Sequence, residues 1–545
     1  MGSSRGKRSC SSPPFRRQPK AKTGERLALA LAVISIACTA PRSDARRTTI
    51  LYASGADLQS INPLVAVHPL AKAVQKHLLL QTLASYDARL EPVPRLASWE
   101  WEDGRRVLVF HLRSDVRWHD GVPTRAVDVV WTLTMARHPE VAYPRARDLA
   151  GVREIALLDS LTVRVRFDHV QPTFPDVFTD LAMLPAHRFE AVLPREIRRA
   201  AFNTAPVGNG PFAFVEYRPN QRWVFRRFED FPVSLGSPAI ERFVIAVVDE
   251  ASTKLAALTS GEVDFAGITA AHAGFVRRDP ALRVFDYPMI FSYALVWNMR
   301  REPFDDVRVR RALTMALDRR AIVAAALYGF GTPADGPVPP EHPWFESVAG
   351  VGHGVEVAGS LLEAAGWETG ADGIRRRDGR RLAFQLLTVG SGDNALEQMI
   401  QAQLRSVGVA VTIRQLELTS FLATAQGEAR DFDALVTGIP GDLALGHVAA
   451  MFDGVMPGPL AYPGYRSAQF DAAMGAVRRA DTEAALEAAW RNAQRILAAE
   501  FPTTWLYHAR GVQGANNRIR SAPPDLRGEL AGVTEWEIEK GRRGR

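Results

Sequence analysis

The chain of 545 residues is long enough for about three domains, and its 47% hydrophobic and 23% charged residues are typical of a globular protein. Residues 1–46 hold ten of the 67 basic and two of the 60 acidic residues, so the remaining 57 basic and 58 acidic residues carry a net charge of −1. This balance argues against a phosphate-binding body and therefore against a nucleic-acid partner.

The amino-terminal segment, residues 1–46, has the pattern of a secretory signal. Basic residues precede the apolar run 27–37, which is too short to cross a bilayer permanently. Ile36-Ala37-Cys38 is similar to a bacterial lipobox, although Ser35 stands where that motif usually has Leu. Two outcomes stay open: a lipid anchor on Cys38, or cleavage after Ala40 to release a free protein. Either one predicts an exported protein, in the periplasm or on the outer face of the cytoplasmic membrane.

Hydrophobic periodicity predicts a mixed α/β body after residue 47. Alternating or continuous apolar runs predict strands at 107–112 and 243–248. They also predict two hairpins, one formed by the strands 152–158 and 161–167 and the other by the strands 212–218 and 222–228. Apolar residues at helical spacing predict helices from Ser252 to about Gly261 and at 397–407, 467–480 and 482–500. A further helix after Thr124 is expected to be capped by that residue and to bury Val127, Val130 and Trp131.

Residues 303–320 predict an amphipathic helix followed by a second one. Asp305 or Asp306 can cap the first helix, whose apolar stripe comprises Val309, Ala312, Leu313, Ala316 and Leu317. Arg308, Arg310 and Arg311 lie off that stripe. Asp318 then begins the second helix, which is expected to run to Tyr328 and stop at Gly329.

Five segments, in this order, carry a resemblance to a known family. They are 96–101 with 111–121, Pro206-Val207-Gly208-Asn209-Gly210-Pro211-Phe212, Gly261-Glu262-Val263-Asp264, 303–320 continuing into 331–334, and 465–471. Together they resemble the peptide-binding family of extracytoplasmic solute receptors that serve ABC transporters, over about residues 48–519. The resemblance implies a two-lobed periplasmic-binding-protein fold of type II with an additional inserted domain.

The implied domains are discontinuous in sequence. Lobe I would take residues 48–80, 205–290 and 500–540, the inserted domain 81–204, and lobe II 291–499. A few chain crossings between two lobes suit hinged closure around a ligand. The resemblance further implies a monomer that hands a small peptide to membrane permeases, with no cofactor.

The family places an Asp that pairs with the peptide α-ammonium in a segment of the form Gly-Trp-x-x-Asp-Tyr-x-x-Pro. In this chain Gly438 and Asp442 match that pattern, whereas Ile439 replaces the Trp and Leu443 the Tyr. Asp442 is therefore expected to bind the ligand beside Gly438 and Ile439; the alternative is a loop Asp that caps a turn or helix. On the facing lobe, Val67 occupies the position of a backbone-contacting stretch, and Tyr143 is expected to lie over the ligand.

The motifs of catalysis and metal binding are missing from the sequence, which contains no Gly-x-Ser-x-Gly, His-Glu-x-x-His or Cys-x-x-Cys. We therefore expect a receptor and not an enzyme, with no metal site. Two alternatives remain: the same receptor binding a sugar, an opine or a chelated metal, and an exported hydrolase.

Overall fold

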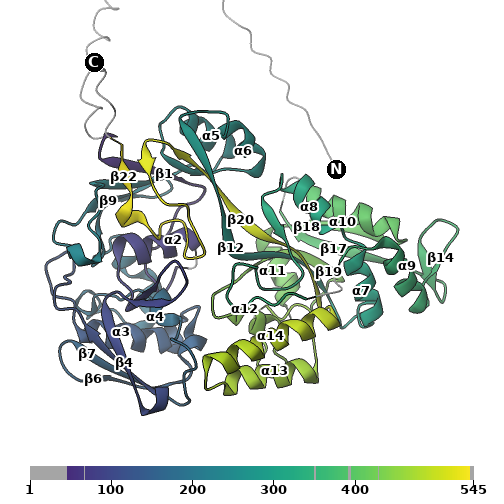
Figure 1. The fold of residues 1–545 in the computed structure, drawn as a ribbon, viewed down its shortest axis with the longest axis horizontal. Helices are drawn as coiled ribbons and strands as arrows, with labels where there is room; N and C mark the ends of the chain where they lie inside the picture. Colours follow the sequence, from purple (N-terminus) through teal and green to yellow (C-terminus); the bar gives the residue numbers. More distant parts are fainter. Residues whose placement is uncertain are drawn as a thin grey trace, which may run out of the picture. The chain divides into compact units, whose positions relative to one another are not determined.

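The structure is a computed structural model that describes residues 46–66, 68–348, 352–390, 394–427, 429–458 and 460–539. From Arg47 onward the chain forms one compact unit. Its main sheet (Figure 1) has the strand order β18 (Ala410–Leu416), β17 (Ala383–Val389), β19 (Ala434–Pro440), β12 (Leu282–Trp297), β20 (Thr503–Asn516), β11 (Phe265–Gly267), β1 (Thr49–Ser54), β10 (Arg242–Val247), β9 (Arg222–Arg227) and β8 (Phe212–Arg218).

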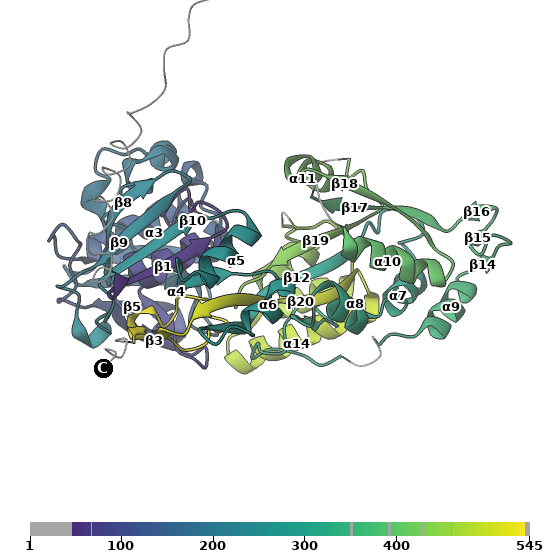
Figure 2. The same ribbon diagram turned by 90° about the horizontal axis from the view of Figure 1, so that it is seen from above.

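Two long antiparallel strands, β12 and β20, connect the two lobes of this unit (Figure 2). The first part of β12, up to Pro288, pairs with the end of β20, and the part from Ser292 pairs with its beginning. The register shifts between Pro288 and Ser292 and again after Tyr293. These two strands are therefore both structural members of each lobe and the covalent link between them.

The first lobe is built on the parallel strands β10, β1 and β11, with the antiparallel strands β9 and β8 at the edge. Its other elements are α2 (Pro69–Val74), the π-helix η1 (Gln75–Leu79), α5 (Ala251–Thr259), α6 (Ala270–Val276), η8 (Val233–Leu235), η9 (Val533–Glu535), β21 (Ile519–Arg520) and β22 (Glu537–Ile538). Asp264 is 0% exposed and accepts from Arg518 Nε at 2.6 Å and from the Leu51 amide at 2.9 Å. The last residue of the Gly-Glu-Val-Asp motif thus ties the carboxyl-terminal segment to β1.

The glycines of the 206–212 motif permit a close crossing of two chain segments. A Cβ on Gly208 would lie 1.9 Å from the Leu79 carbonyl oxygen, and one on Gly210 would lie 2.5 Å from that of Leu78. The amides of Asn209 and Gly210 donate to the Leu79 oxygen at 3.0 and 2.8 Å. Any side chain at either glycine would break this contact.

The inserted domain has a four-stranded antiparallel sheet. Its elements are β4 (Ala97–Glu102), β5 (Val107–Leu112), β7 (Thr162–Phe167) and β6 (Val152–Leu157) in sheet order, the pair β2 (Ala84–Tyr86) and β3 (Pro92–Pro94), the helices α3 (Ala126–Arg137) and α4 (Val177–Asp180), and the 3₁₀ turns η2 (Asp103–Arg105), η3 (Pro139–Val141), η4 (Ala146–Leu149), η5 (Ala186–Arg188), η6 (Pro194–Arg199) and η7 (Ala201–Asn203). Phe110 of this domain and Phe243 and Phe265 of the first lobe belong to one continuous apolar core.

Helix α3 departs from the sequence prediction. The helix begins one residue later than expected, after Arg125, and Val127 is 51% exposed, so the predicted cap at Thr124 and the burial of Val127 are wrong. The reason is Asp128, whose carboxylate is buried and accepts from the Arg125 amide at 2.9 Å and from Trp118 Nε1 at 3.0 Å. Polar residues therefore share the inward face of this helix with apolar ones.

The second lobe surrounds β17, β18 and β19. Its other elements are β13 (Gly331–Pro333), which pairs with β20, the small sheet β14 (Glu368–Thr369), β15 (Arg375–Arg377) and β16 (Arg380–Arg381), and the helices α7 (Val307–Met315), α8 (Arg319–Ala326), α9 (Val355–Ala364), α10 (Ala395–Ser406), α11 (Leu418–Gln426), α12 (Gly446–Phe452), α13 (Ala468–Arg479) and α14 (Glu483–Glu500). No helix in the described part of the chain is both long and apolar enough to cross a membrane.

The helix pair predicted from residues 303–320 is confirmed. Asp306 caps α7 by accepting from the Arg308 amide at 2.8 Å, and the five stripe residues are each at most 1% exposed. Helix α8 ends at Ala326, two residues earlier than predicted, because Tyr328 and Gly329 take positive φ angles of 51° and 84°.

Arg310, which lies off the apolar stripe of α7, is only 3% exposed. It donates to the carbonyls of Glu500 at 2.6 Å and Phe501 at 3.1 Å, at the end of α14, and to that of Phe304 at 2.8 Å. A helix end leaves carbonyl groups without partners inside the helix, so this guanidinium joins α7 to α14.

The strands and helices predicted from periodicity lie where they were expected, within one to two residues at each end. The division into 48–80, 81–204, 205–290, 291–499 and 500–540 stays a prediction. The apolar clusters of the second lobe also contain Trp505, Leu506 and Tyr507, beyond the proposed boundary at 499.

Candidate functional site

Asp442 lies in the loop that connects β19 to α12. Its two carboxylate oxygens accept from the amides of Gly446 at 2.9 Å and His447 at 3.1 Å, so Asp442 caps the amino end of α12. Leu445, the residue before the helix, takes a left-handed conformation with φ 59° and turns the chain back over the carboxylate. The side chain of Asp442 remains 27% exposed. A carboxylate can accept about four hydrogen bonds, so two acceptor positions remain.

His447 lies beside Asp442 and is 4% exposed at its side chain. Its Nδ1 is 3.4 Å from the Asp442 amide and 3.6 Å from Oδ2 of the same residue. Burial raises the pKa of Asp442, but the bond to His447, the charges of His447 and Arg145 and the Gly446 amide outweigh it and place this pKa well below its ordinary value. Asp442 is therefore ionised at neutral pH.

Two further histidines line this region of the second lobe. His342 accepts from the Trp344 amide at Nδ1, at 3.0 Å, so its Nε2 carries the proton and donates to the Leu443 carbonyl at 3.0 Å. Burial lowers the pKa of His342 and, with the charge of His447, lowers that of His508 to about 3. His342 thus holds the backbone of the Asp442 loop as a neutral group.

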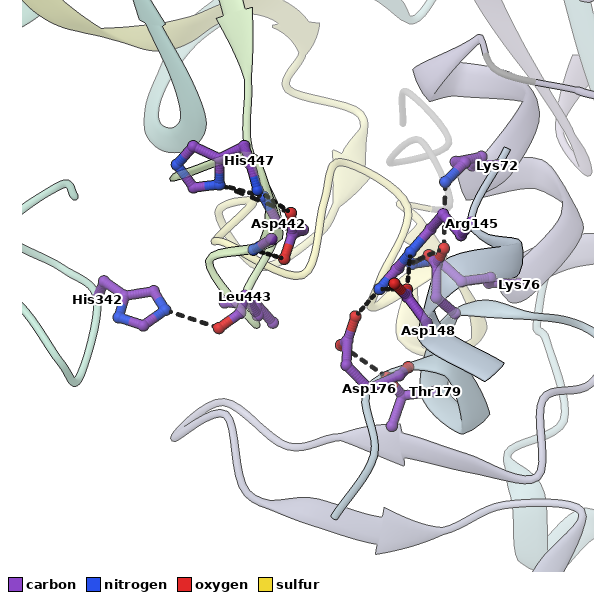
Figure 3. Close-up of polar contacts among 12 residues, drawn as sticks. Lys72, Lys76, Arg145, Asp148, Asp176, Thr179, His342, Asp442, Leu443 and His447 are labelled. Carbon is purple, nitrogen blue, oxygen red and sulfur yellow. Dashed lines mark hydrogen bonds and ion pairs between the residues drawn. The ribbon is translucent and has the colours of Figure 1, made fainter. Parts of the chain in front are cut away.

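A group of six charged residues, which we call the facing cluster, lies opposite the Asp442 loop (Figure 3). Its members are Lys72, Lys76, Arg145, Asp148, Asp176 and Asp180. Arg145 contacts three carboxylates: those of Asp148 at 2.6 Å, Asp176 at 2.7 Å and Asp180 at 2.9 Å. Asp180 also accepts from Lys72 at 3.1 Å and Lys76 at 3.0 Å.

The facing cluster and Asp442 interact electrostatically. The Arg145 charge contributes to the low pKa of Asp442, and the Asp442 charge contributes to the raised pKa of Asp148, which burial raises most. A hydrogen bond from Arg147 to the Pro457 carbonyl, at 3.4 Å, also joins the two sides. Within the facing cluster three cations balance three carboxylates, and none of these three cations forms an ion pair with Asp442, whose nearest basic group is His447 at 3.6 Å. The partly exposed carboxylate of Asp442 can therefore accept a positive group of a ligand.

The other predicted ligand contacts lie in more enclosed places. A Cβ on Gly438 would lie 2.4 Å from Phe291 Cζ, so the Phe291 ring covers this glycine. Ile439 is 1% exposed and belongs to an apolar core cluster of the second lobe, and Tyr143 is 6% exposed in the core of the inserted domain. Contacts of these three residues with a ligand stay predictions. Val67 and Cys38 lie outside the described residues.

Sequence reasoning missed the facing cluster and His447. The spacing of Arg145 and Asp148, three residues apart, is a local signal of an ion pair. Arg145 is separated from Asp176 and Asp180 by 31 and 35 residues, and the two lysines are more than 100 residues from Asp180. No local sequence pattern therefore predicts these contacts. Within the described ranges, no group of three or more His, Cys, Asp or Glu is placed to hold a metal ion.

The chain forms two α/β lobes that are joined by a pair of long strands, with an inserted domain. This architecture is the type II fold of a periplasmic binding protein, and charged loops of the two sides face each other in it. Residues 91–450 match the family described as bacterial extracellular solute-binding proteins, family 5 Middle. The match covers more than half of the chain, and the chain belongs to this family of solute receptors.

Similar proteins include peptide receptors and a receptor for a different ligand. The chain is 24% identical over 481 residues to the oligopeptide-binding protein AppA of Bacillus subtilis. This alignment covers 85% of this chain and 87% of AppA. The structure of AppA in complex with a nonapeptide has a TM-score of 0.75 at 23% identity and covers 90% of this chain and 99% of that one. The structure of NikZ from Campylobacter jejuni in complex with Ni(L-His) has a TM-score of 0.77 at 22% identity, with coverages of 90% and 99%.

Proposed function

We propose that the protein is an exported receptor that binds a peptide between its two lobes and delivers it to an ABC importer in the membrane. The observation that carries the proposal is Asp442: an ionised carboxylate, 27% exposed, with two acceptor positions left over and no ion pair to the cations of the facing cluster. A peptide supplies the complementary group at its α-ammonium. The similarity to AppA supports a peptide as the ligand class.

The remaining contacts of such a ligand would come from its main chain. An extended peptide is held by backbone hydrogen bonds, which give affinity without a fixed side-chain sequence. The ammonium–carboxylate pair then fixes the register of the peptide, because it forms only at the amino terminus. A charge-assisted bond is stronger in a closed, water-poor site than at a surface.

The first experiment identifies the ligand. Native mass spectrometry of protein purified without refolding detects what the protein retains, and a library of peptides of two to nine residues ranks binders by calorimetry. The selected peptide is then compared with its Nα-acetylated form. We expect acetylation to weaken binding by wild type, and a library without any binder would refute the peptide assignment.

Asp442→Asn tests the residue itself. Asn is also a favourable capping residue, so the substitution removes the charge and keeps one of the two capping bonds through its single amide oxygen. Losing one partner of a buried charge pair costs about 2–5 kcal/mol, which is roughly 30-fold or more in affinity. Acetylation should matter much less to this variant than to wild type. Equal binding by the two proteins would leave Asp442 with its capping role alone.

A non-peptide ligand is the second candidate, and the similarity to NikZ favours it. A single carboxylate does not distinguish an α-ammonium from another cation, so a chelated metal or an opine also fits. An exported hydrolase is the third. Ser292 Oγ lies 2.8 Å from Nδ1 of His508, but these residues are 5% and 3% exposed, out of reach of a substrate. Turnover of the selected peptide by purified protein would revive this candidate.

Export and anchoring form a separate part of the proposal. The proposal of export rests on the basic segment followed by the apolar run 27–37. Amino-terminal sequencing of protein from its native cells should show a start at residue 38 or 41, and an intact Met1 would contradict export by this signal. Cys38→Ser should release the protein from membranes if Cys38 is lipidated. Sedimentation of the purified protein tests the proposed monomer.

A further inference from the structure

One arginine lies where the two long strands link the lobes, and it contacts a carboxylate on each side. Arg510 belongs to β20 and stands opposite Pro288 of β12, where the pairing of the two strands shifts its register. Its Nε donates to the carboxylate of Asp286, in the first-lobe part of β12. Its Nη1 donates to Glu341 Oε1 at 3.2 Å, in the segment of the second lobe that follows β13. The guanidinium therefore joins the two lobes at their hinge.

We call Asp286, Arg510 and Glu341 the hinge triad. Their side chains are 35%, 22% and 34% exposed, so the two ion pairs are partly shielded from solvent. Nη2 of Arg510 also donates to the Asp286 carbonyl at 3.3 Å, which fixes the guanidinium to both the side chain and the backbone of one residue. A guanidinium is planar and presents its donors in a rigid fork. Its bonds to β12 therefore determine where Glu341 binds.

The residue after Glu341 extends this contact to the candidate ligand site. His342 is 4% exposed, and its Nε2 donates at 3.0 Å to the carbonyl of Leu443, the residue after Asp442 (Figure 3). Its Nδ1 accepts from the Trp344 amide at 3.0 Å, so both ring nitrogens are bonded. One peptide unit and one imidazole ring thus connect the hinge triad to the loop that holds Asp442.

The remainder of this segment is anchored to α14. The side chain of Gln494 donates to the Trp344 carbonyl at 2.8 Å and accepts from the Glu346 amide at 3.1 Å. Arg491 donates to the Phe345 carbonyl at 2.6 Å. Because the segment is bonded along its length, a displacement of its hinge end is passed on to the groups that it contacts.

We propose that the hinge triad positions the Asp442 loop through His342, so that the hinge and the ligand site are coupled. Arg510, Glu341 and His342 are then positioning residues, which act on the ligand through Asp442. The inference rests on the proposed function in one respect, because it takes Asp442 as the residue that binds the ligand's positive group. The coupling of hinge and loop is a property of the protein alone and is measurable without a ligand.

A positioned loop favours binding and ties it to closure. A loop that is already held in its binding conformation loses less freedom when the ligand arrives, and less of the interaction energy is spent on ordering it. Hinged closure changes a few positions in the strands that link two lobes, and the hinge triad spans this point. A ligand that binds better at one hinge angle shifts the open–closed equilibrium by that difference in affinity.

Hydrogen exchange of Glu341→Gln tests the coupling without a ligand. Gln keeps the size of the side chain and removes the charge that binds Arg510. The reporters are the amides of Gly446 and His447, which donate to the Asp442 carboxylate and exchange when the loop opens locally. We expect both amides to exchange about threefold faster than in wild type, equivalent to about 0.7 kcal/mol, which is typical of a partly exposed ion pair.

Two further variants complete the comparison. Glu302→Gln is the matched control, because Glu302 pairs with Arg380 at 2.8 Å on β16, at the end of the second lobe that lies far from the hinge (Figure 2). It should exchange as wild type does. His342→Phe removes the donor to the loop and should also accelerate exchange. Combined with Glu341→Gln it should exchange no faster than alone, because the two changes interrupt one path. Melting temperatures verify that all variants are folded.

Calorimetry with the library-selected peptide and its Nα-acetylated form tests the positioning of Asp442. A charge-assisted hydrogen bond depends on distance and direction, so a displaced carboxylate gives the free peptide less advantage over the acetylated one. The ratio of the two affinities should be about threefold smaller in Glu341→Gln than in wild type, and unchanged in Glu302→Gln. A defect in folding alone would weaken both peptides equally and leave this ratio as it is.

Three results would overturn the inference. The first is exchange at Gly446 and His447 that is the same in Glu341→Gln and wild type. The second is a combined variant whose acceleration is the product of the two single effects, which indicates independent paths. The third is an unchanged ratio of affinities. Failure of wild type to distinguish the free from the acetylated peptide would instead refute the contact proposed at Asp442, and the exchange comparison would still decide whether hinge and loop are coupled.

Discussion

Asp180→Asn tests whether the facing cluster stabilises the fold. The Asp180 carboxylate is 13% exposed and pairs with Arg145, Lys76 and Lys72 at 2.9, 3.0 and 3.1 Å. Removing it leaves three cations close together with two carboxylates. Breaking a buried ion pair costs about 3–5 kcal/mol. Because the side chains of Lys72 and Lys76 are 32% and 23% exposed, solvent screens them, and we expect about 3 kcal/mol.

The effect of Asp180→Asn depends on pH with a definite sign. Burial alone raises the pKa of Asp180, but the charges of Lys76, Lys72 and Arg145 outweigh it and hold the pKa well below its ordinary value. A carboxylate with a lowered pKa in the folded state contributes stability above its unfolded pKa of about 4, and this contribution is lost as the pH falls toward the folded value. The wild-type advantage should therefore shrink by about 1.4 kcal/mol per pH unit below about pH 4.

The assay is equilibrium unfolding in urea at pH 7 and at steps below pH 4, with Glu190→Gln as the control for loss of a surface carboxylate. A difference from wild type below about 1 kcal/mol at pH 7 would mean that the cluster behaves as an ordinary surface network. A difference that stays constant below pH 4 would contradict the assignment of the stabilisation to ionised Asp180.

Three further substitutions test other parts of the fold. Burial and the His447 charge lower the pKa of His508 to about 3, so His508 takes up a proton on unfolding below about pH 6.5. The free energy of unfolding of wild type should therefore fall by about 1.4 kcal/mol per pH unit between pH 6 and 4. His508→Asn should show a shallower dependence of this free energy on pH in urea titrations. Arg310→Met should cost about 1–3 kcal/mol for each buried carbonyl that it leaves without a donor at the end of α14, and Arg310→Lys should be intermediate. Chemical denaturation of both variants measures this, and equal stability of wild type and Arg310→Met would contradict it. Gly438→Ala should cost about 1–3 kcal/mol because its Cβ would lie 2.4 Å from the Phe291 ring, and a melting temperature unchanged from wild type would show that the ring moves freely.

Local sequence patterns predicted much of the secondary structure correctly. The stripe of α7, the caps Asp306 and Asp318 and the hairpin of β6 and β7 each depend on residues a few positions apart, so their spacing is visible in the sequence. Prediction failed for the inward face of α3, where buried Asp128 bonds Trp118 and the Ala186 amide. A prediction from hydrophobic periodicity considers apolar residues only. It therefore misses a polar residue that is buried because tertiary partners satisfy its hydrogen bonds.

The sequence by itself determined the elements, their order and, through the resemblance of several motifs, the family and the position of Asp442. Only the tertiary structure decided what surrounds that carboxylate. It showed that Asp442 caps α12 beside His447, and that Arg145 and Asp148 come to face it from nearly 300 residues earlier in the chain. The physical reason is that a cap depends on local spacing, whereas a charge site assembled from separate lobes depends on how β12 and β20 bring those lobes together.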